Sequence, residues 1–518
     1  MQNLTRRDFL RYVSASASVI AGGRLADSVA ATEDSKPVKR PNILWIMMDD
    51  CRADAVGCYG RRWAKTPNMD AVAKRGVRFD VAIIKNPVCI PSRSSMKTGY
   101  YPHEIGVMYM GKPPEVEPPY AKTARRNAPN LINEWKKVGI TPVSVGKRHA
   151  YENDWDHRGD VDGDVSYLGE PKSDDLKRRI ETSGRKYPAA VTRTHKWAIG
   201  GILPLRPEET DTWRLGDLAV DALEELAGRD EPFFLRASFH APHVPCSVCE
   251  SYFIDPATID LPLPTEEELK SKPRFERENI QIYSGADLTK EQIGIARGTY
   301  YGMVSLVDAQ VGRLVEVLKK SGKLDNTIIA INSDQGFQLG EHGFWKKRCF
   351  YEQNVRVPLI ISCPGILTSN KVIQEPVEMI DFIPTMMELS GLNVPSSISG
   401  RSMMPLIEGK VSRWKPACFC EHDYSGDEYD ELRKDGGRCV MVRTKEWKLV
   451  YFKDERVKDA EGLETNSLYN LKNDPGETRN LYGKDEYNEI VRHLKESAQR
   501  WDHGVTDESQ VRLQSQYF

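Results

Sequence analysis

The sequence predicts an α/β fold, in which a mostly parallel central sheet is sandwiched by helices and followed by a smaller C-terminal α+β subdomain. Short runs of β-branched and large apolar residues alternate with longer segments of helical periodicity through most of the chain, the pattern of a parallel sheet covered on both faces. After about residue 410 the pattern changes to short hairpin-like runs and one amphipathic helix. The length of 518 residues also favours one large domain with a smaller partner.

The expected elements of the main domain, residues 32–410, alternate along the chain. Because parallel strands are buried on both faces, they carry continuous apolar runs rather than an alternating pattern. Such runs occupy residues 42–48, 140–145, 232–239, 327–332 and 357–362. Segments with apolar residues at helical spacing lie between them, at 68–75, 130–137, 211–226 and 297–320.

Two further regions complete the predicted organisation. Residues 160–210 are charged and contain Pro and Gly, so we expect a long insertion that lies over the sheet and borders the substrate. The C-terminal subdomain, residues 411–518, should contain a small antiparallel sheet and a terminal helix. Its expected parts are a hairpin of 439–444 and 447–452, a turn at Asp474-Pro475-Gly476 and a helix over 487–501.

Residues 1–31 have the pattern of a twin-arginine signal peptide. Arg6 and Arg7 precede a mildly apolar stretch of Ala, Ser and Gly, and Ser28-Val29-Ala30 matches a small-x-small cleavage site. A disordered arm that happens to carry two arginines is the alternative, but here charge, apolar stretch and cleavage site come in the order of a signal. We therefore expect the twin-arginine export machinery as a partner and a periplasmic or extracellular location.

Composition excludes several classes of function. Without residues 1–31 the chain has 69 basic and 73 acidic residues, a net charge of −4, whereas nucleic-acid binding needs a clustered basic excess. No uninterrupted apolar run is long enough to span a membrane in the mature form. Ten scattered cysteines allow disulfides without requiring them. Cys246-x-x-Cys249 and Cys418-x-Cys420 lack the paired second half of a zinc site.

Polar residues follow four of the five predicted strands. Ligands of open α/β sheets bind beyond the carboxyl ends of the strands, so these residues are candidates for one site. They are Asp49-Asp50, Gly146-Lys147-Arg148-His149, His240-Ala241-Pro242-His243 and Asp334-Gln335-Gly336. Adjacent aspartates after a strand are more often a helix cap or a turn. The second acidic strand end, at Asp334, favours a metal site instead.

The ligand set suggested by these strand ends contains only oxygen. Asp49, Asp50 and Asp334 offer carboxylates, and Gln335 offers an amide oxygen. Hard divalent cations prefer such ligands, so we expect Ca²⁺, with Mg²⁺ as the second candidate.

The segment from Asn86 to Gly99, Asn-Pro-Val-Cys-Ile-Pro-Ser-Arg-Ser-Ser-Met-Lys-Thr-Gly, resembles the signature of the formylglycine-dependent sulfatases of the alkaline phosphatase superfamily. In that family Cys-x-Pro-Ser-Arg, followed by Thr-Gly and an aromatic-Pro stretch like Tyr101-Pro102-His103, marks the cysteine for oxidation to formylglycine by a maturation enzyme. The resemblance implies that Cys89 is this cysteine and that the fold is alkaline-phosphatase-like. A buried, inert cysteine before a helix is the alternative.

The resemblance covers nearly the whole mature chain. It runs from Asn42 to the segment 468–477, Leu-Tyr-Asn-Leu-Lys-Asn-Asp-Pro-Gly-Glu, and looks closest to iduronate-2-sulfatase and the bacterial carbohydrate sulfatases. The implied activity is hydrolysis of a sulfate ester on a small molecule or glycan. Two positions depart from the family pattern. Gln335 stands where Asn or His is usual, and Arg148 replaces the Trp of Gly-Lys-Trp-His.

The resemblance also implies roles for individual residues. Hydrated formylglycine at position 89 would attack sulfur with one hydroxyl and use the other to release sulfate, beside a metal held by Asp49, Asp50, residue 89, Asp334 and Gln335. Arg93, one helical turn on if Pro91 opens a helix, would hold the diol or a sulfate oxygen. The remaining expected roles are sulfate binding by Lys147 and Lys347, proton uptake by His149 and protonation of the leaving alcohol by His243.

Two rival functions fit the same residues. A phosphodiester or phosphonate monoester hydrolase of this superfamily would share the modified cysteine and the metal ligands. A catalytically silent glycan-binding protein would retain the scaffold without modification of Cys89.

Overall fold

A computed structural model gives the structure of most of the chain. It describes residues 40–108, 131–148, 155–161, 164–166, 169–192, 196–283, 288–411, 414–424, 437–453 and 465–502. The expected signal peptide, residues 1–31, lies outside these ranges. Among the described residues, no helix has the length and apolar character needed to cross a membrane.

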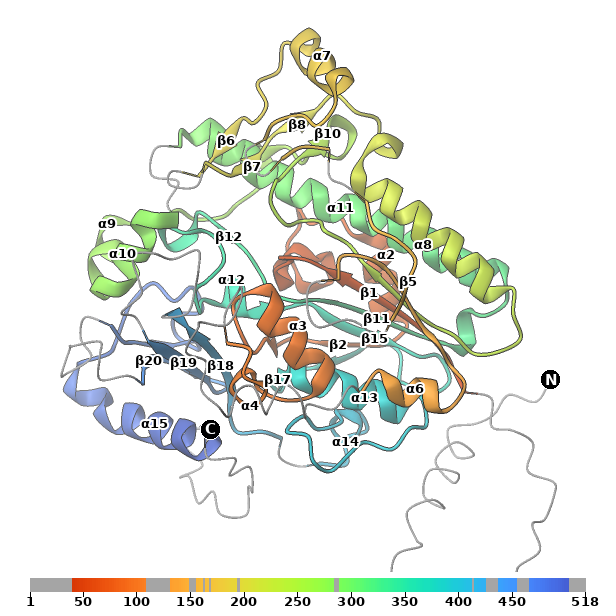
Figure 1. Ribbon diagram of the computed structural model, residues 1–518. Helices are drawn as coiled ribbons and strands as arrows, with labels where there is room; N and C mark the ends of the chain where they lie inside the picture. The colour runs from red at the N-terminus through yellow and green to blue at the C-terminus, as the bar shows by residue number, and fades with distance from the viewer. Residues whose placement is uncertain are drawn as a thin grey trace, which may run out of the picture.

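An eight-stranded sheet forms the centre of the molecule (Figure 1). β1 (Asn42–Met48) is wholly buried and pairs in parallel with β11 (Thr327–Ser333) on one side and β9 (Phe234–Ser238) on the other. The complete order is β16 (Lys371–Ile373), β2 (Val77–Phe79), β15 (Leu359–Ser362), β11, β1, β9, β4 (Pro142–Gly146) and β5 (Asp156–His157). The mostly parallel sheet is thus confirmed.

One strand runs against the others. β15, within the predicted run 357–362, is antiparallel to both β11 and β2. A parallel crossover needs a connection that returns along the sheet, usually a helix. Between β11 and β15 the chain instead forms only short elements, namely β12 (Gln338–Leu339), the 3₁₀ helix η7 (Glu341–Gly343), β13 (Trp345–Lys346), α12 (Glu352–Val355) and β14 (Arg356–Val357).

Helices cover both faces of the sheet, as predicted (Figure 1). Alternate residues of β1 enter different cores: Leu44, Ile46 and Met48 join the core under α2 (Pro67–Lys74), α8 (Asp211–Ala227) and α11 (Lys290–Lys320). The intervening residues, with Trp45 at their centre, join the core under α3 (Cys89–Thr98), α6 (Asn133–Lys137) and α13 (Phe382–Leu389). α11 begins seven residues before the expected position 297, because Thr289 and Gln292 form a capping box.

The predicted insertion contains small elements of its own. Its described parts include α7 (Asp174–Ser183), which stands away from the sheet in Figure 1, and three short strands. These are β6 (Ala190–Val191), β7 (Ala198–Gly200) and β8 (Ile202–Leu203). The Cys246 amide donates to the Ala198 carbonyl at 2.9 Å. The insertion therefore reaches the loop that follows β9.

The C-terminal subdomain has a four-stranded antiparallel sheet in the order β18 (Cys418–Asp423), β19 (Arg438–Arg443), β20 (Trp447–Phe452) and β21 (Ser467–Asn470). The predicted hairpin is β19–β20. The predicted helix is α15 (Asn488–Asp502), whose Leu494 and Trp501 share a core with Val440 and Leu449. The boundary at residue 410 stays a prediction. No disulfide links the ten cysteines, all of which lie in the described ranges.

Candidate active site

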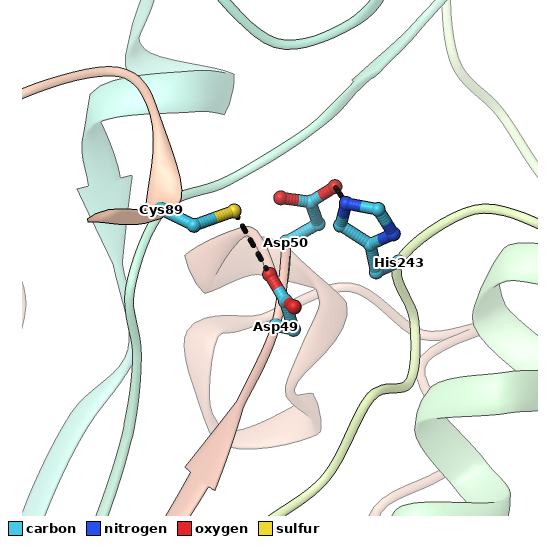
Figure 2. A group of neighbouring side chains, drawn as sticks. All are labelled: Asp49, Asp50, Cys89 and His243. Atoms are coloured by element: carbon cyan, nitrogen blue, oxygen red, sulfur yellow. Dashed lines mark hydrogen bonds and ion pairs between the residues drawn. The ribbon is translucent and has the colours of Figure 1, made fainter. Parts of the chain in front are cut away.

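The polar residues expected from the strand ends meet at the carboxyl edge of the central sheet. Asp49 and Asp50 follow β1, Lys147 follows β4, His243 lies in the loop after β9, and Asp334 with Gln335 follows β11. In Figure 2 the side chains of Asp49, Asp50, Cys89 and His243 point toward a common centre. One ligand atom from each of these four residues lies within 4.8 Å of the others.

Cys89 belongs to this cluster and is completely buried. Its Sγ accepts hydrogen bonds from Lys347 Nζ at 2.8 Å and Gln335 Nε2 at 3.1 Å, and lies 3.5 Å from Asp49 Oδ1. Burial, reinforced by the Asp49 carboxylate, raises the pKa of the thiol to about 12. An unmodified Cys89 would therefore stay protonated at neutral pH and be a poor nucleophile.

Helix α3 begins at Cys89 itself, two residues earlier than the expected start at Pro91. Arg93 nevertheless lies one turn further on and points back into the site. Its Nε donates to Asp334 Oδ2 at 2.5 Å, and its Nη1 donates to Ser238 Oγ at 3.1 Å. Position 89 therefore stands at the positive end of a ten-residue helix, with a guanidinium beside it.

The two aspartates after β1 have different partners and different acidities. Asp49 contacts the Lys147 ammonium, whereas Asp50 Oδ1 accepts from Lys347 Nζ at 2.8 Å. Burial raises the pKa of Asp49, but Lys147, Arg93 and Lys347 together hold it well below its usual range. Burial prevails at Asp50 and raises its pKa, although Lys347 opposes the shift.

Asp334 connects the end of β11 to the loop after β1 and to helix α3. Its Oδ1 accepts from the amides of Asp50 at 3.2 Å and Gln335 at 2.9 Å, while its carbonyl accepts from Ser92 Oγ at 2.5 Å. Burial raises the pKa of Asp334 to about 6 even though the Arg93 guanidinium opposes it. Three buried carboxylates that disfavour one another's charge are the usual setting for a bound cation.

The donor set fits an oxygen-ligated divalent ion. Among buried atoms of the described residues, Asp50 Oδ2 and Gln335 Oε1 have no hydrogen-bond partner. Gln335 Nε2 instead faces the carboxylates, at 3.1 Å from Asp49 Oδ1 and in a close contact with Asp50. Rotation of the amide by half a turn would direct Oε1 at the same point and supply a neutral oxygen ligand.

Two lysines and a histidine complete the site. Gly146, with φ +83°, ends β4 so close to Ser238 that a Cβ atom would lie 2.2 Å from the Ser238 carbonyl oxygen, and this approach places Lys147 in the cluster. Burial lowers the pKa of both lysines, but the neighbouring carboxylates outweigh it: Asp49 raises the pKa of Lys147, and Asp50 raises that of Lys347. Both ammonium groups are therefore fixed charges.

One ring nitrogen of His243 is hydrogen-bonded to the backbone. Its Nδ1 lies 2.5 Å from the Val244 carbonyl oxygen, so Nδ1 carries a proton, and Nε2 faces Asp50 Oδ2 at 3.7 Å. Burial, Lys147 and Lys347 lower the pKa of His243 well below its usual range. The neutral ring therefore offers Nε2 as a proton acceptor.

The structure brings together every predicted site residue that it describes, and only His149 lies outside the described residues. Sequence reasoning missed Ser238, which bonds Arg93, and Tyr300, whose hydroxyl bonds the backbone beside Asp50. Ser238 is the last residue of β9 and the last but one of the predicted strand 232–239, and that position was a usable signal. Tyr300 lies within a helix, and no local pattern marks it.

Comparison with known proteins supports the resemblance. The family model described as "Sulfatase" matches residues 41–392, and that described as "N-sulphoglucosamine sulphohydrolase, C-terminal" matches 340–503. An arylsulfatase of Clostridium perfringens is 30% identical, covering 88% of this chain and 93% of the relative. An N-acetylglucosamine-6-O-sulfatase of Bacteroides thetaiotaomicron is 27% identical, covering 93% and 90%.

Solved structures show the same fold. A phosphonate monoester hydrolase from Silicibacter pomeroyi superposes with a TM-score of 0.74 at 24% identity, covering 91% of this chain and 97% of the other. Three observations point to the same family. They are the cluster at the strand ends, the signature around Cys89 and the match of the family model to residues 41–392. The chain belongs to the sulfatase family of the alkaline phosphatase superfamily and is a sulfuric ester hydrolase.

Proposed function

We propose that the protein hydrolyses a carbohydrate sulfate ester with a nucleophile made from Cys89 by oxidation to formylglycine. A divalent ion would assist, with Ca²⁺ as the first candidate and Mg²⁺ as the second. Its ligands would be Asp49, Asp50, residue 89, Asp334 and Gln335. One observation carries this proposal. The side chain of Cys89 is buried at the point where a carboxylate cage meets the Lys347 ammonium, 2.8 Å from Sγ. A nucleophile at this atom would have a metal on one side and cations for a sulfate group on the other.

The cations of the site would bind the sulfate group. Lys147, Lys347 and Arg93 are each fixed by a carboxylate, so their positions are set before substrate arrives. Preorganised donors of this kind stabilise charge that develops on oxygen in the transition state. When bound, the metal polarises a sulfate oxygen, and the hydrated formyl group supplies the attacking hydroxyl.

His243 is the candidate for proton transfer to the leaving oxygen. The Val244 carbonyl fixes its ring so that Nε2 faces the cluster. A sulfate group beside Nε2 would offset the two ammonium charges that disfavour the protonated ring, and the imidazolium could then donate to the departing alcohol. The resemblance assigns the second proton transfer, from the diol, to His149.

The carbohydrate assignment is supported by the names of relatives and by the sequence pattern of residues 1–31. The B. thetaiotaomicron relative is named for an amino-sugar sulfate, and the second family model is named for N-sulphoglucosamine. The twin-arginine pattern of residues 1–31 adds export to the periplasm or beyond, where sulfated glycans are met. Maturation would require a formylglycine-generating enzyme in the same host.

Mass spectrometry of the peptide that holds residue 89, joined to a desulfation screen over sulfated sugars, tests the proposal. We expect an aldehyde or its hydrate at position 89 and release of sulfate from at least one sugar. Cys89→Ala should abolish release, whereas Cys363→Ala, which replaces a buried cysteine in the core under α3, α6 and α13 that is not a residue of the site, should retain it. An active protein with an unmodified Cys89 would contradict the nucleophile assignment.

Paired substrates separate the rival functions. Turnover of an aryl sulfate should exceed that of the matching aryl phosphodiester, and a clear preference for the diester would replace the sulfatase proposal by the phosphonate or phosphodiester hydrolase. A protein that binds sulfated glycans, keeps an unmodified Cys89 and releases no sulfate would instead be the silent glycan-binding form.

A further inference from the structure

Tyr300 of α11 reaches into the loop that carries Asp49 and Asp50. Its side chain is wholly buried. The hydroxyl donates to the Asp50 carbonyl oxygen at 2.7 Å and accepts from the Arg52 amide at 3.1 Å. The hydroxyl thus acts as both donor and acceptor, and both hydrogen bonds go to the backbone on either side of Cys51.

That loop has a backbone that needs external support. Asp50 has a φ of +65°, in the left-handed region that residues with a Cβ seldom adopt, and such conformations persist where the surroundings over-determine them. The next two amides and that of Asp50 itself are each bound by a different side chain. Asp50 N donates to Asp334 Oδ1, Cys51 N to Ser333 Oγ at 2.9 Å and Arg52 N to Tyr300 Oη.

The ring of Tyr300 contacts the second ligand-bearing segment. It stacks on Phe337, with ring centroids 5.3 Å apart and planes 24° from parallel, and Phe337 lies two residues beyond Gln335. One side chain thus touches the segments that follow β1 and β11. Of the three side chains that bind the loop amides, Ser333 and Asp334 belong to the end of β11. Tyr300 belongs to helix α11, in a different layer of the molecule.

We propose that Tyr300 is a positioning residue for the metal site, which fixes the left-handed turn at Asp50 so that the Asp50 carboxylate faces the ion. The inference rests on the proposed function, since it assumes that a divalent ion binds there. Residues that orient metal ligands typically change metal affinity by 10–100-fold when they are replaced. The loss of the Tyr300 hydroxyl would leave the Asp50 carbonyl and the Arg52 amide without a partner and release the turn.

Tyr301 provides a matched control. It lies on the same helix and is 1% exposed, and its ring packs edge-to-face against Trp63 and against Tyr300, with centroids 6.2 and 5.7 Å apart, respectively. Tyr301→Phe removes the same atom at the same depth as Tyr300→Phe. A general effect of deleting a buried hydroxyl would therefore appear in both variants, whereas an effect through Asp50 would appear only at position 300.

The experiment measures Ca²⁺ binding by titration calorimetry for the full chain and both variants, at equal occupancy of the modification at residue 89. We expect Tyr300→Phe to raise the Kd for Ca²⁺ at least about 10-fold, and its kcat to recover as Ca²⁺ is raised, because the ligands remain. Tyr301→Phe should bind within about twofold of the parent. If Tyr300→Phe does not fold, Ser333→Ala, which releases the adjacent amide, should raise the Kd in the same direction.

The possible failures are distinguishable. Equal Ca²⁺ affinity in the parent and Tyr300→Phe, or in the parent and Ser333→Ala where that variant is used, would overturn the positioning role and leave the proposed function standing. Equal losses in Tyr300→Phe and Tyr301→Phe would overturn it as well. A parent protein that binds no divalent ion would overturn the proposed metal site, and this inference with it.

Discussion

Each cation of the site is paired with a carboxylate that the proposed metal would also bind. The pairs are Lys147 with Asp49, Lys347 with Asp50 and Arg93 with Asp334. A bound divalent ion would take up the negative charge of the three carboxylates, because it is the largest local charge. The ammonium and guanidinium groups would then keep their positions with uncompensated charge, which is the condition for holding a sulfate group.

Lys347 should contribute most directly to sulfate binding, since its Nζ lies 2.8 Å from both Asp50 Oδ1 and Cys89 Sγ. Lys347→Met should lower kcat/KM by roughly 10²–10³-fold, as when one preorganised donor to a developing oxyanion is removed. Steady-state kinetics at saturating Ca²⁺ measures the loss. The exposed Lys319→Met serves as the control, and a loss below threefold at position 347 would exclude the assigned role.

Gln335 allows a separate prediction, because its side chain carries the amide one methylene further from the backbone than Asn does. Gln335→Leu removes the amide oxygen and should weaken Ca²⁺ binding about 10–100-fold. Gln335→Asn introduces one of the two residues usual in the family, and this variant should bind Ca²⁺ more tightly than Gln335→Leu does. Calorimetric titration of both variants provides the comparison, and equal affinities would mean that no amide oxygen reaches the ion.

Much of this site could be predicted because its residues directly follow long buried strands or lie in a continuous signature. Tyr300 could not, since its contact with Asp50 joins positions 250 residues apart and depends on how α11 packs. The amide orientation of Gln335 is likewise set by tertiary neighbours. The long strands β1 and β11 have strong apolar runs, whereas the three-residue strands β2 and β16 are too short for any period to show.

The apolar pattern of a strand also does not indicate whether the strand is parallel or antiparallel to its neighbours. The run that became β15 was as apolar as that of β1, and only the connection before it makes it antiparallel. The capping box that starts α11 was present in the sequence as Thr289 and Gln292, but its apolar periodicity becomes regular only later. Local hydrogen bonding thus extended an element beyond the segment that packing alone would predict.

Strand β17 (Val377–Glu378) ends at a buried ion pair that predicts how stability depends on pH. Glu378 contacts Lys85 and accepts from Lys415 Nζ at 2.8 Å. Burial raises the pKa of Glu378, but Lys415 and Lys85 lower it to about 2. Because the folded pKa lies below the unfolded value, the pair stabilises the protein above about pH 4.5, and this contribution is lost as the pH falls toward 2.

Glu378→Gln should therefore unfold more easily than the parent at pH 7, by roughly 3–5 kcal/mol, as when one partner of a buried pair is removed. The difference should shrink as the pH falls from 4.5 toward 2, because Glu378 of the unfolded chain is protonated below about pH 4.5, whereas the folded ion pair keeps its charge until the pH nears 2. Chemical denaturation across this pH range gives both values. The exposed Glu267→Gln should show no such trend, and a constant difference at position 378 would contradict the ionised pair.

The C-terminal sheet and the main domain share buried charges, which implies that they unfold together. Lys448 of β20 is wholly buried and lies 2.9 Å from Glu352 Oε1 and 2.7 Å from Glu477 Oε1, while its Nζ donates to the Phe350 carbonyl at 3.0 Å. At the other end of the interface, Tyr101 beyond α3 meets Trp501 of α15 edge-to-face, with centroids 5.1 Å apart. Neither part can leave without stranding ionised groups in an apolar interior.

We therefore expect one calorimetric transition for the intact protein, with loss of activity at the same temperature. Lys448→Met should lower the stability of the whole molecule by roughly 3–5 kcal/mol, because two buried carboxylates lose their cation. Lys472→Met removes a surface lysine from the same subdomain, 66% exposed, and should change stability by less than about 0.5 kcal/mol. Two transitions in the parent, or a Lys448→Met variant in which only the C-terminal sheet melts early while activity persists, would show that the buried charges do not couple the two parts.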